Sequence, residues 1–197
     1  METERNELFP VFLKLNQLKV LLVGAGPVGL EKLTAILSNA PKTFIKVVAK
    51  DVLPGIKKLA IVHSNILIEE RPYQAKDMRD WDIAIVAVNN RHLSEEIYGH
   101  AKEAGILVNV ADTPDLCDFY LSSIVQKGQL KIAISTNGKS PTMAKRMREW
   151  LSGILPENLD PLLDNLYQIR QKIRGDFEEK VKRLDAITAG MVDGKKE

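Results

Sequence analysis

The sequence predicts an α/β protein, a doubly wound parallel sheet followed by a small β segment and a C-terminal helical segment. Three observations favour this fold. Short apolar runs alternate with helix-like patterns over residues 1–113. One of these runs, Ile83–Val88, is unbroken, as expected for a strand buried on both faces of a parallel sheet. A glycine turn connects the first apolar run to the first helix.

The composition describes an ordinary globular chain and excludes several classes of function. The 197 residues carry a net charge of +2, too small to indicate a nucleic-acid partner. The chain has no apolar run of about 18 residues, so we expect no membrane span, and its acidic start does not resemble a signal peptide. Cys117 is the only cysteine, and the three histidines are scattered, so no fixed metal site is predicted. We expect a cytoplasmic enzyme.

The stretch Lys19–Lys32 carries the clearest binding signal, because Gly24, Gly26 and Gly29 fit the pattern G-x-G-x-x-G. In this pattern the first glycine permits a tight turn, the second lets the backbone approach a pyrophosphate, and the third allows close helix–strand packing. Pro27 suits the first helical position, and the helix N-terminus offers N–H groups to phosphates. A purely structural turn is the alternative. The strand and helix on either side favour a dinucleotide site of the Rossmann type.

The remaining strands of the sheet follow from their apolar runs. We expect helices after the first and fourth strands, where apolar residues recur at helical spacing. The expected strands span residues 19–23, 45–49, 66–70, 83–88 and 106–110.

Polar residues follow three of these strands, at the edge where parallel sheets bind ligands. Asp51 is a candidate ligand of the ribose, whereas Lys50 could approach a phosphate, so this position leaves NAD and NADP open. Asn89 ends the fourth strand. Asp112 follows the fifth, where a carboxylate could exchange a proton beside a nicotinamide. The alternatives are solvated charges for Lys50 and Asp51 and a turn residue for Asp112.

After residue 113 the pattern changes. Residues 122–125 and 130–135 predict a β-hairpin, and Ser140 and Pro141 suit the start of a helix. Lys139, Lys145, Arg146 and Arg148 form a basic cluster there, either a solvated helix face or a dock for a polyanionic substrate. The apolar residues of that helix, among them Met143, Met147 and Trp150, are expected to be core.

The C-terminal part predicts a helical stretch from Asp160 to about Thr188, which Gly175 could break or kink. We therefore divide the chain into a Rossmann-type domain (1–113), a β-hairpin dimerisation segment (114–145) and a C-terminal helical segment (146–197). A lone hairpin rarely forms a stable unit, which favours a homodimer. We interpret Cys117 as a packing residue, and the apolar lead-in Leu8–Leu13 as an edge strand or a loop pinned on the core.

Taken together, these motifs resemble the N-terminal part of the siroheme synthases, a family of precorrin-2 dehydrogenases and sirohydrochlorin ferrochelatases. The likeness covers residues 7–155 in order, and the two later β motifs make it more specific than the glycine turn alone. The matching stretches are Leu8–Leu13, Val23–Val28 with Glu31 and Lys32, Ala84–Asn90, Asn109–Asp112, Ser122–Val125 and Ile132–Pro141.

The resemblance implies NAD-dependent oxidation of precorrin-2 to sirohydrochlorin, in siroheme biosynthesis, by a homodimer. It implies that Asp112 is the catalytic residue, that Pro27 and Val28 line the cofactor, and that Lys50 and Asp51 lie at its adenosine end. Lys139, Ser140, Lys145 and Arg146 become candidates for binding the substrate carboxylates. Some members also insert ferrous ion, and the sequence leaves this second activity open.

Two alternatives use the same glycine turn. A non-catalytic dinucleotide-sensing module would need an attached DNA-binding or membrane element, and the sequence contains neither. Another small NAD(P)-dependent reductase would not need the paired motifs within residues 122–141, so the presence of these motifs argues against it.

Overall fold

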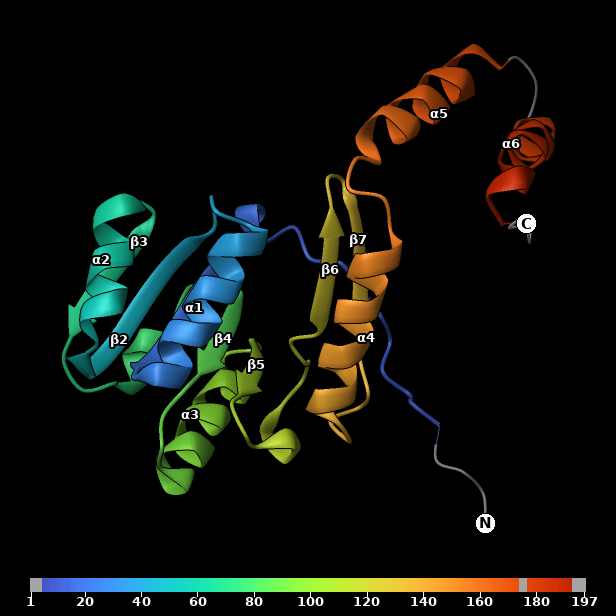
Figure 1. Cartoon of the computed structure of the whole chain (residues 1–197). Helices are drawn as coiled ribbons and strands as arrows, with labels where there is room; N and C mark the ends of the chain where they lie inside the picture. The colour runs from blue at the N-terminus through green and yellow to red at the C-terminus, as the bar shows by residue number, and fades with distance from the viewer. Residues whose placement is uncertain (1–4, 174–176, 193–197) are drawn as a thin grey trace. The chain divides into compact units, whose positions relative to one another are not determined.

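The chain divides into two units, Glu7–Leu121 and Ser122–Glu197, the second including Met1–Asn6 (Figure 1). The structure is a computed structural model that describes residues 5–173 and 177–192.

A five-stranded parallel sheet forms the centre of the first unit, with the strand order β3-β2-β1-β4-β5. The strand bounds are Lys19–Ala25 for β1, Phe44–Val52 for β2, Ile66–Glu70 for β3, Ile83–Val86 for β4 and Leu107–Val110 for β5. The α-helices are Pro27–Asn39 (α1), Pro54–Val62 (α2) and Arg91–Glu103 (α3), and the 3₁₀ turns are Leu15–Gln17 (η1), Ala75–Met78 (η2) and Pro114–Leu116 (η3). The predicted fold class is confirmed.

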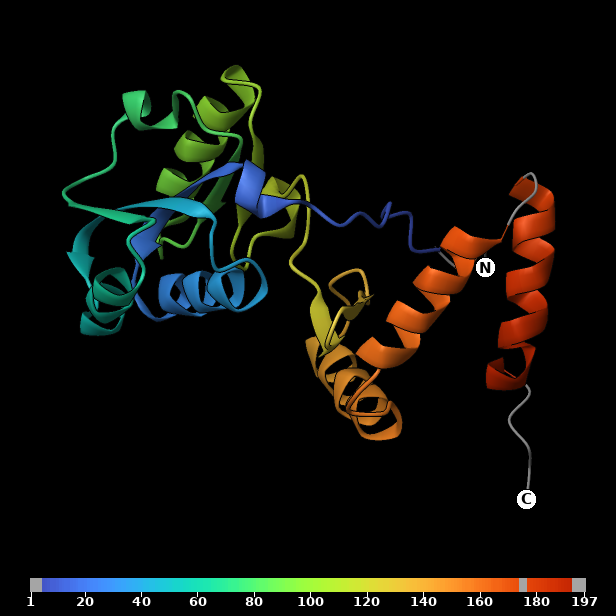
Figure 2. The same ribbon diagram turned by 90° about the horizontal axis from the view of Figure 1, so that it is seen from above.

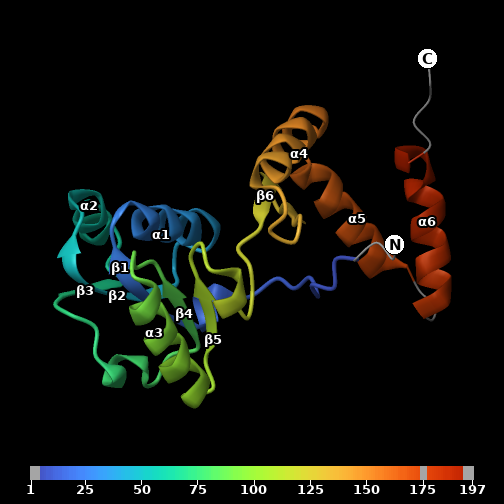
Figure 3. The same cartoon turned by 90° about the horizontal axis from the view of Figure 1, so that it is seen from below.

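Helices cover both faces of the sheet, with α1 and α2 on one side and α3 on the other (Figures 2 and 3). Alternate residues of the strands point to opposite faces, so each strand supplies both cores. Leu22 of β1 packs in the same cluster as Leu33 of α1, whereas Leu21 shares its cluster with Ile97 of α3. Burial on both faces explains why the central strands are continuous apolar runs.

The strand order places a topological switch point between β1 and β4. From β1 the chain builds outward to β2 and β3, and from β4 it builds in the other direction to β5. The loops after β1 and β4 therefore leave the sheet in opposite directions and open a crevice at its carboxyl edge, which is where such sheets bind ligands.

The second unit contains a hairpin and three helices. The antiparallel pair Ser123–Lys127 (β6) and Leu130–Ile134 (β7) turns at Gly128, which has a φ of +58°. The helices are Pro141–Ile154 (α4), Asp160–Lys172 (α5) and Phe177–Val192 (α6). The predicted start of α4 is confirmed, because the Ser140 hydroxyl accepts a hydrogen bond from the Met143 amide at 3.2 Å.

The predicted helical stretch of the C-terminal segment is divided between α5 and α6, since α5 ends at Lys172 and Ile173 has extended backbone; Gly175 lies outside the described residues. Elsewhere in the architecture, one helix was not predicted and one expectation was wrong. The helix α2 had been missed, because only Ile56 among its residues is fully buried and its apolar pattern is short. The lead-in Leu8–Leu13 forms no strand and is not packed on the core, since the side chain of Phe9 is 86% exposed.

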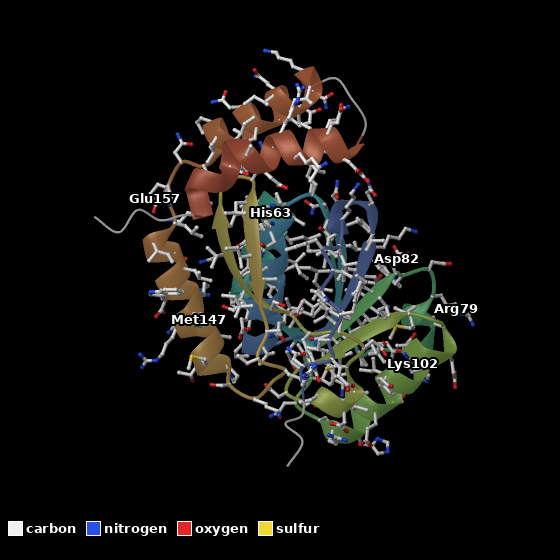
Figure 4. The ribbon with its side chains drawn as sticks, turned by 90° about the vertical axis from the view of Figure 1, so that its right-hand side faces the viewer. His63, Arg79, Asp82, Lys102, Met147 and Glu157 are labelled. Carbon is white, nitrogen blue, oxygen red and sulfur yellow. The ribbon has the colours of Figure 1, made fainter. Side chains whose placement is uncertain are left out.

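The apolar residues of α4 are also not core. Met143, Met147 and Trp150 are exposed, and Figure 4 labels Met147 on this helix. Ala144 is buried instead, and α4 packs against β6 and β7. The helix therefore has a second apolar stripe that this unit does not cover, which the spacing alone could not distinguish from a core face.

Candidate active site

A pocket of about 1050 Å³ lies at the carboxyl edge of the sheet, within the first unit. It collects residues at or just beyond the carboxyl ends of all five strands, so Val23 and Thr113, 90 positions apart in the sequence, share one cavity. The predicted site residues that line it are Gly24, Gly26, Pro27, Val28, Lys50, Asp51, Asn89 and Asp112.

The three glycines of the turn have different surroundings. Gly24 has a φ of +100°, and a Cβ atom on it would lie 2.3 Å from the carbonyl oxygen of Ala87. A Cβ atom on Gly29 would lie 2.3 Å from the carbonyl oxygen of Gly24, so Gly29 packs beneath the turn and does not line the pocket. A Cβ atom on Gly26 would have no neighbour within 4 Å, because Gly26 faces open space.

This arrangement fits the pyrophosphate of a dinucleotide. The open space beside Gly26 adjoins the first turn of α1, whose amides have no partner within the helix and carry a partial positive charge. Pro27 has no N–H group, so its place at the first helical position wastes no donor. The turn can therefore hold a diphosphate through backbone groups, with no basic side chain.

One side of the pocket includes two residues that the sequence analysis missed, Pro72 and Tyr73. They follow β3, next to the exposed Lys50 and Asp51 of β2. The Tyr73 hydroxyl lies 3.1 Å from Nδ1 of His100 on α3, and burial, with nearby carboxylates, raises the pKa of Tyr73 to about 12. The signal that could have found them is their position directly after a strand, at the same edge as the other loops.

An ion pair holds the loop that carries Tyr73. The Arg71 guanidinium donates to both carboxylate oxygens of Asp77, at 2.7 and 2.5 Å, and also to Glu69. Asp77 is only 4% exposed and accepts a further hydrogen bond from the Gln74 amide at 2.9 Å. The Arg71 guanidinium holds the pKa of the Asp77 carboxyl below its usual range. Arg71 and Asp77 lie on either side of Pro72 and Tyr73 in the sequence, so charge-assisted hydrogen bonds join the two ends of the loop that carries these lining residues.

Asp112 lies on the opposite side of the pocket, directly after β5. It is exposed, and its backbone has a φ of +57°, in the left-handed region that residues other than glycine rarely adopt. Such a conformation costs on the order of 1–3 kcal/mol and persists only where the surroundings enforce it. An outlier of this kind at a pocket points to a functional residue.

Arg91 connects the loops after β4 and β5. It starts α3 and lines the pocket, and its guanidinium donates to Asp115 at 2.5 Å and to Glu95 at 2.7 Å. The same hydrogen bond from Arg91 lowers the pKa of Asp115. The side chains of Arg91, Glu95 and Asp115 are each at least half exposed, so their ion pairs contribute little to the stability of the protein. We assign the Arg91–Asp115 pair a role in orienting the two loops.

The predicted substrate-binding residues belong to the second unit. Lys139 and Ser140 lie in the loop before α4, and Lys145 and Arg146 lie in its first two turns. Lys145 is within 3.9 Å of Glu149. Their role stays a prediction.

Among residues 5–173 and 177–192, no cluster of three or more His, Cys, Asp or Glu side chains is arranged to hold a metal ion. No helix in this part of the chain is long and apolar enough to cross a bilayer.

Comparison with known proteins agrees with this geometry. Residues 11–123 match the family described as "Putative NAD(P)-binding", and residues 127–152 match "Sirohaem biosynthesis protein central". The siroheme synthase of Psychrobacter cryohalolentis is 35% identical over 176 residues, and that of Methylococcus capsulatus is 30% identical over 174. These stretches are 89% and 88% of this chain but only 32% and 36% of the relatives, so the chain spans about a third of their length.

A solved structure titled "SirC, precorrin-2 dehydrogenase" has the same fold. It superposes with a TM-score of 0.68 over 91% of this chain and 89% of its own, at 24% sequence identity.

Fold and site together define a dinucleotide-binding α/β protein, with its pocket at the switch point of a parallel sheet. The chain belongs to the NAD(P)-binding family matched over residues 11–123, and the resemblance to siroheme synthases drawn from its motifs is confirmed.

Proposed function

We propose that this protein oxidises precorrin-2 to sirohydrochlorin with NAD, in siroheme biosynthesis. The observation that carries the proposal is the single pocket that holds both the glycine turn and Asp112. The titles of the similar proteins, siroheme synthase and precorrin-2 dehydrogenase, give the substrate class. The oxidation removes a hydride and a proton from the tetrapyrrole, so it needs a hydride acceptor and a group that takes up the proton.

The residues of the pocket divide between these two needs. NAD, when bound, supplies the hydride acceptor. The turn at Gly24 and Gly26 and the start of α1 hold its pyrophosphate, and Asn89 lies beside them at the end of β4. Asp112, on the β5 side, accepts the proton through its exposed carboxylate. These side-chain roles rest on position and chemistry.

The β2 side of the pocket supports NAD as the coenzyme. Asp51 can accept hydrogen bonds from ribose hydroxyls, and its negative charge opposes a 2′-phosphate. Arg71 does not compensate for that charge, since its guanidinium is committed to Asp77 and Glu69. An Asp51→Asn variant removes this negative charge and leaves the positive charge of Lys50, which can attract a 2′-phosphate. The variant should therefore show a smaller preference for NAD over NADP.

The basic residues around the start of α4 are proposed to bind the substrate. Precorrin-2 carries many carboxylates, and Lys139, Lys145 and Arg146, together with the Ser140 hydroxyl, match that chemistry. An Arg146→Gln variant should raise the KM for precorrin-2 and leave the affinity for NAD unchanged.

The test is an anaerobic assay. Purified protein is mixed with precorrin-2 and NAD, and NADH and sirohydrochlorin are followed by absorbance. Turnover supports the dehydrogenase; ferrous ion added afterwards tests whether the same protein also inserts iron. NAD binding without turnover would reject the dehydrogenase and favour the chelatase alone or a dinucleotide-sensing module.

Asp80→Asn is the matched control for Asp112→Asn in this assay. Asp80 is exposed and also has a left-handed backbone, with a φ of +66°, but it does not line the pocket. If both variants lose activity equally, or if Asp112→Asn retains the wild-type rate, Asp112 does not handle the proton.

We also propose that the protein is a homodimer in the cytoplasm. A two-stranded hairpin is marginal alone, and α4 beside it exposes Met143, Met147 and Trp150. The free cysteine fits a reducing compartment. Light scattering at micromolar concentration should give a dimer, which Trp150→Glu dissociates and Lys145→Glu, on the same helix, does not. A monomeric wild-type protein would reject this interface.

A further inference from the structure

The outer edge of β5 is closed in an unusual way. β5 is an edge strand that pairs with β4 alone, so the peptide groups of Val108 and Val110 that face away from β4 need other partners. The chain returns along this edge after η3 and supplies those partners. We call the side chains of Asn109, Cys117 and Asp118 the β5 clamp.

Asp118 pairs with Val108 in the manner of a neighbouring strand. Its amide donates to the Val108 carbonyl at 2.8 Å, and its carboxylate accepts from the Val108 amide at 3.0 Å. The second carboxylate oxygen accepts from Lys102 on α3 at 2.7 Å, and Lys102 is labelled in Figure 4. The Asp118 side chain is 19% exposed and its bond to the Val108 amide is partly buried, whereas the Lys102 side chain is 45% exposed.

Cys117 closes the other half of the edge. Its sulfur accepts from the Val110 amide at 3.3 Å, and its S–H group lies 3.2 Å from the Val110 carbonyl and 3.3 Å from the Thr113 carbonyl. A thiol has one proton, so it donates to one of these carbonyls at a time. Burial raises the pKa of the Cys117 thiol, which keeps that proton in place at neutral pH.

Asn109 joins the clamp to the chain beyond it. This residue is 6% exposed, and its side-chain amide donates to the Phe119 carbonyl at 2.8 Å and contacts the Cys117 sulfur at 3.5 Å. The three side chains of the clamp thus join β5 to the returning chain: Asp118 and Cys117 bond to the backbone of Val108 and Val110, and Asn109 bonds to the backbone of Phe119.

The contacts of Cys117 converge on the turn that carries Asp112. Val110 and Thr113 flank this turn on its two sides, and the Thr113 amide also donates to the Val110 carbonyl at 3.3 Å. Between them lies Asp112, with its left-handed backbone and its place in the pocket wall. The conformation is unfavourable for an aspartate, so bonds from outside the turn must maintain it.

We infer that the β5 clamp positions Asp112 for the reaction, so that Cys117, Asn109 and Asp118 act on turnover through Asp112. The expected effect on the rate of precorrin-2 oxidation rests on the proposed function. None of the three clamp residues lines the pocket, so they are positioning residues and make no contact with the bound molecules. A loss of the clamp should therefore displace the carboxylate and leave the dinucleotide site intact.

Cys117→Ala and Cys117→Ser form the central pair of variants. Serine retains a donor and an acceptor, whereas alanine removes both and leaves the Val110 amide without its partner. We expect Cys117→Ala to lower kcat about tenfold, with the KM for NAD and the affinity for NADH within about twofold of wild type. Cys117→Ser should stay within about threefold of the wild-type kcat. A Cys117→Ala protein with the wild-type kcat would overturn the inference.

A second comparison separates positioning from general loss of structure. In an Asp112→Asn background, Cys117→Ala should cause no further loss of kcat, because residues that act through one another are not additive. An equal loss in both backgrounds would show that Cys117 does not act through Asp112. Lys102→Met is the control for Asp118→Ala: it removes the ion pair and keeps the bonds to Val108, so its kcat should match wild type.

A measurement without substrate tests the clamp independently of the proposed function. In Cys117→Ala, the amides of Val110 and Thr113 should exchange hydrogen faster than in wild type, while those of the glycine turn should be unchanged. Wild-type protein that binds NAD but does not oxidise precorrin-2 would reject the proposed function. Unchanged exchange at Val110 would reject the clamp, whatever the assay shows.

Discussion

The glycine turn after β1 and the aspartate turn after β5 meet similar demands in different ways. Both leave the carboxyl edge of the same sheet, both line the pocket, and both contain a residue with positive φ, +100° at Gly24 and +57° at Asp112. At Gly24 a side chain would collide with the Ala87 carbonyl. At Asp112 a side chain is required, because its carboxylate is the proposed reactive group.

This difference shows what each turn contributes. A turn that binds phosphate through its backbone can use glycine, which adopts positive φ at no steric cost. A turn that presents a reactive side chain cannot, so its unfavourable backbone has to be held by neighbours such as Cys117.

Gly24→Ala should destabilise the protein most. The new Cβ would lie 2.3 Å from a backbone carbonyl, which cannot move aside easily, and alanine rarely adopts a φ of +100°. We expect a loss of about 3 kcal/mol in the free energy of unfolding, measured by urea denaturation. Gly99→Ala on α3, where nothing lies within 4 Å of the added Cβ, is the control and should be stabilising or neutral. A stable Gly24→Ala protein would contradict the close packing of the turn.

Asp112→Gly should have the opposite profile. Removing the carboxylate should lower kcat by about 100-fold, while glycine relieves the left-handed backbone and leaves the protein as stable as wild type or slightly more stable. Steady-state kinetics and thermal unfolding of the same preparation measure both effects. Asp112→Asn, which keeps the side-chain size, should lose activity without the gain in stability. Destabilisation by glycine would show that Asp112 is not strained.

Gly26→Ala should affect binding alone. The added methyl group meets no protein atom within 4 Å, so the free energy of unfolding should stay within about 0.5 kcal/mol of wild type. The methyl group does enter the space proposed for the pyrophosphate, and the affinity for NADH should fall about tenfold. Fluorescence titration of NADH measures this. Unchanged affinity would move the pyrophosphate away from Gly26.

The smallest effect is a pH dependence that the aspartate turn has and the glycine turn lacks. Burial raises the pKa of Cys117 in the folded protein above its ordinary value of 9.0, so the unfolded chain loses this proton first. The stabilising contribution of the thiol is therefore complete below pH 9 and is lost as the pH rises through the folded pKa. The unfolding free energy of wild type should fall relative to that of Cys117→Ser above pH 9. Parallel pH profiles would contradict a buried, protonated thiol.

Sequence reasoning was strongest where the requirement was local. The β1 strand, the glycines and the start of α1 lie within one stretch, and the cap formed by Ser140 and Pro141 depends on adjacent residues. It was weakest where burial decides the outcome. The apolar spacing of Met143, Met147 and Trp150 is the same whether that face is core or exposed, and only the packing of Ala144 on the hairpin distinguishes the two.

The loop that carries Tyr73 and the β5 clamp could not be predicted either, because both depend on contacts that form only in the folded protein. Arg71 and Asp77 form their pair across a loop, and Asn109 and Asp118 bond to backbone groups whose availability depends on β5 being an edge strand. No local pattern records strand order. Asp112 could be selected as a candidate from its place after a strand. The structure shows that it lies in a turn and also lines the pocket, and its catalytic role stays a prediction.

The sequence by itself determined the strands of the sheet, most of its helices and the glycine turn, because glycine, proline and apolar periodicity act through neighbouring residues. Only the tertiary structure decided which loops share the pocket, that Asp112 has a left-handed backbone, and which side chains bond to the residues on either side of it. These properties arise from strand order and from hydrogen bonds between segments, and such contacts are made only when the sheet assembles.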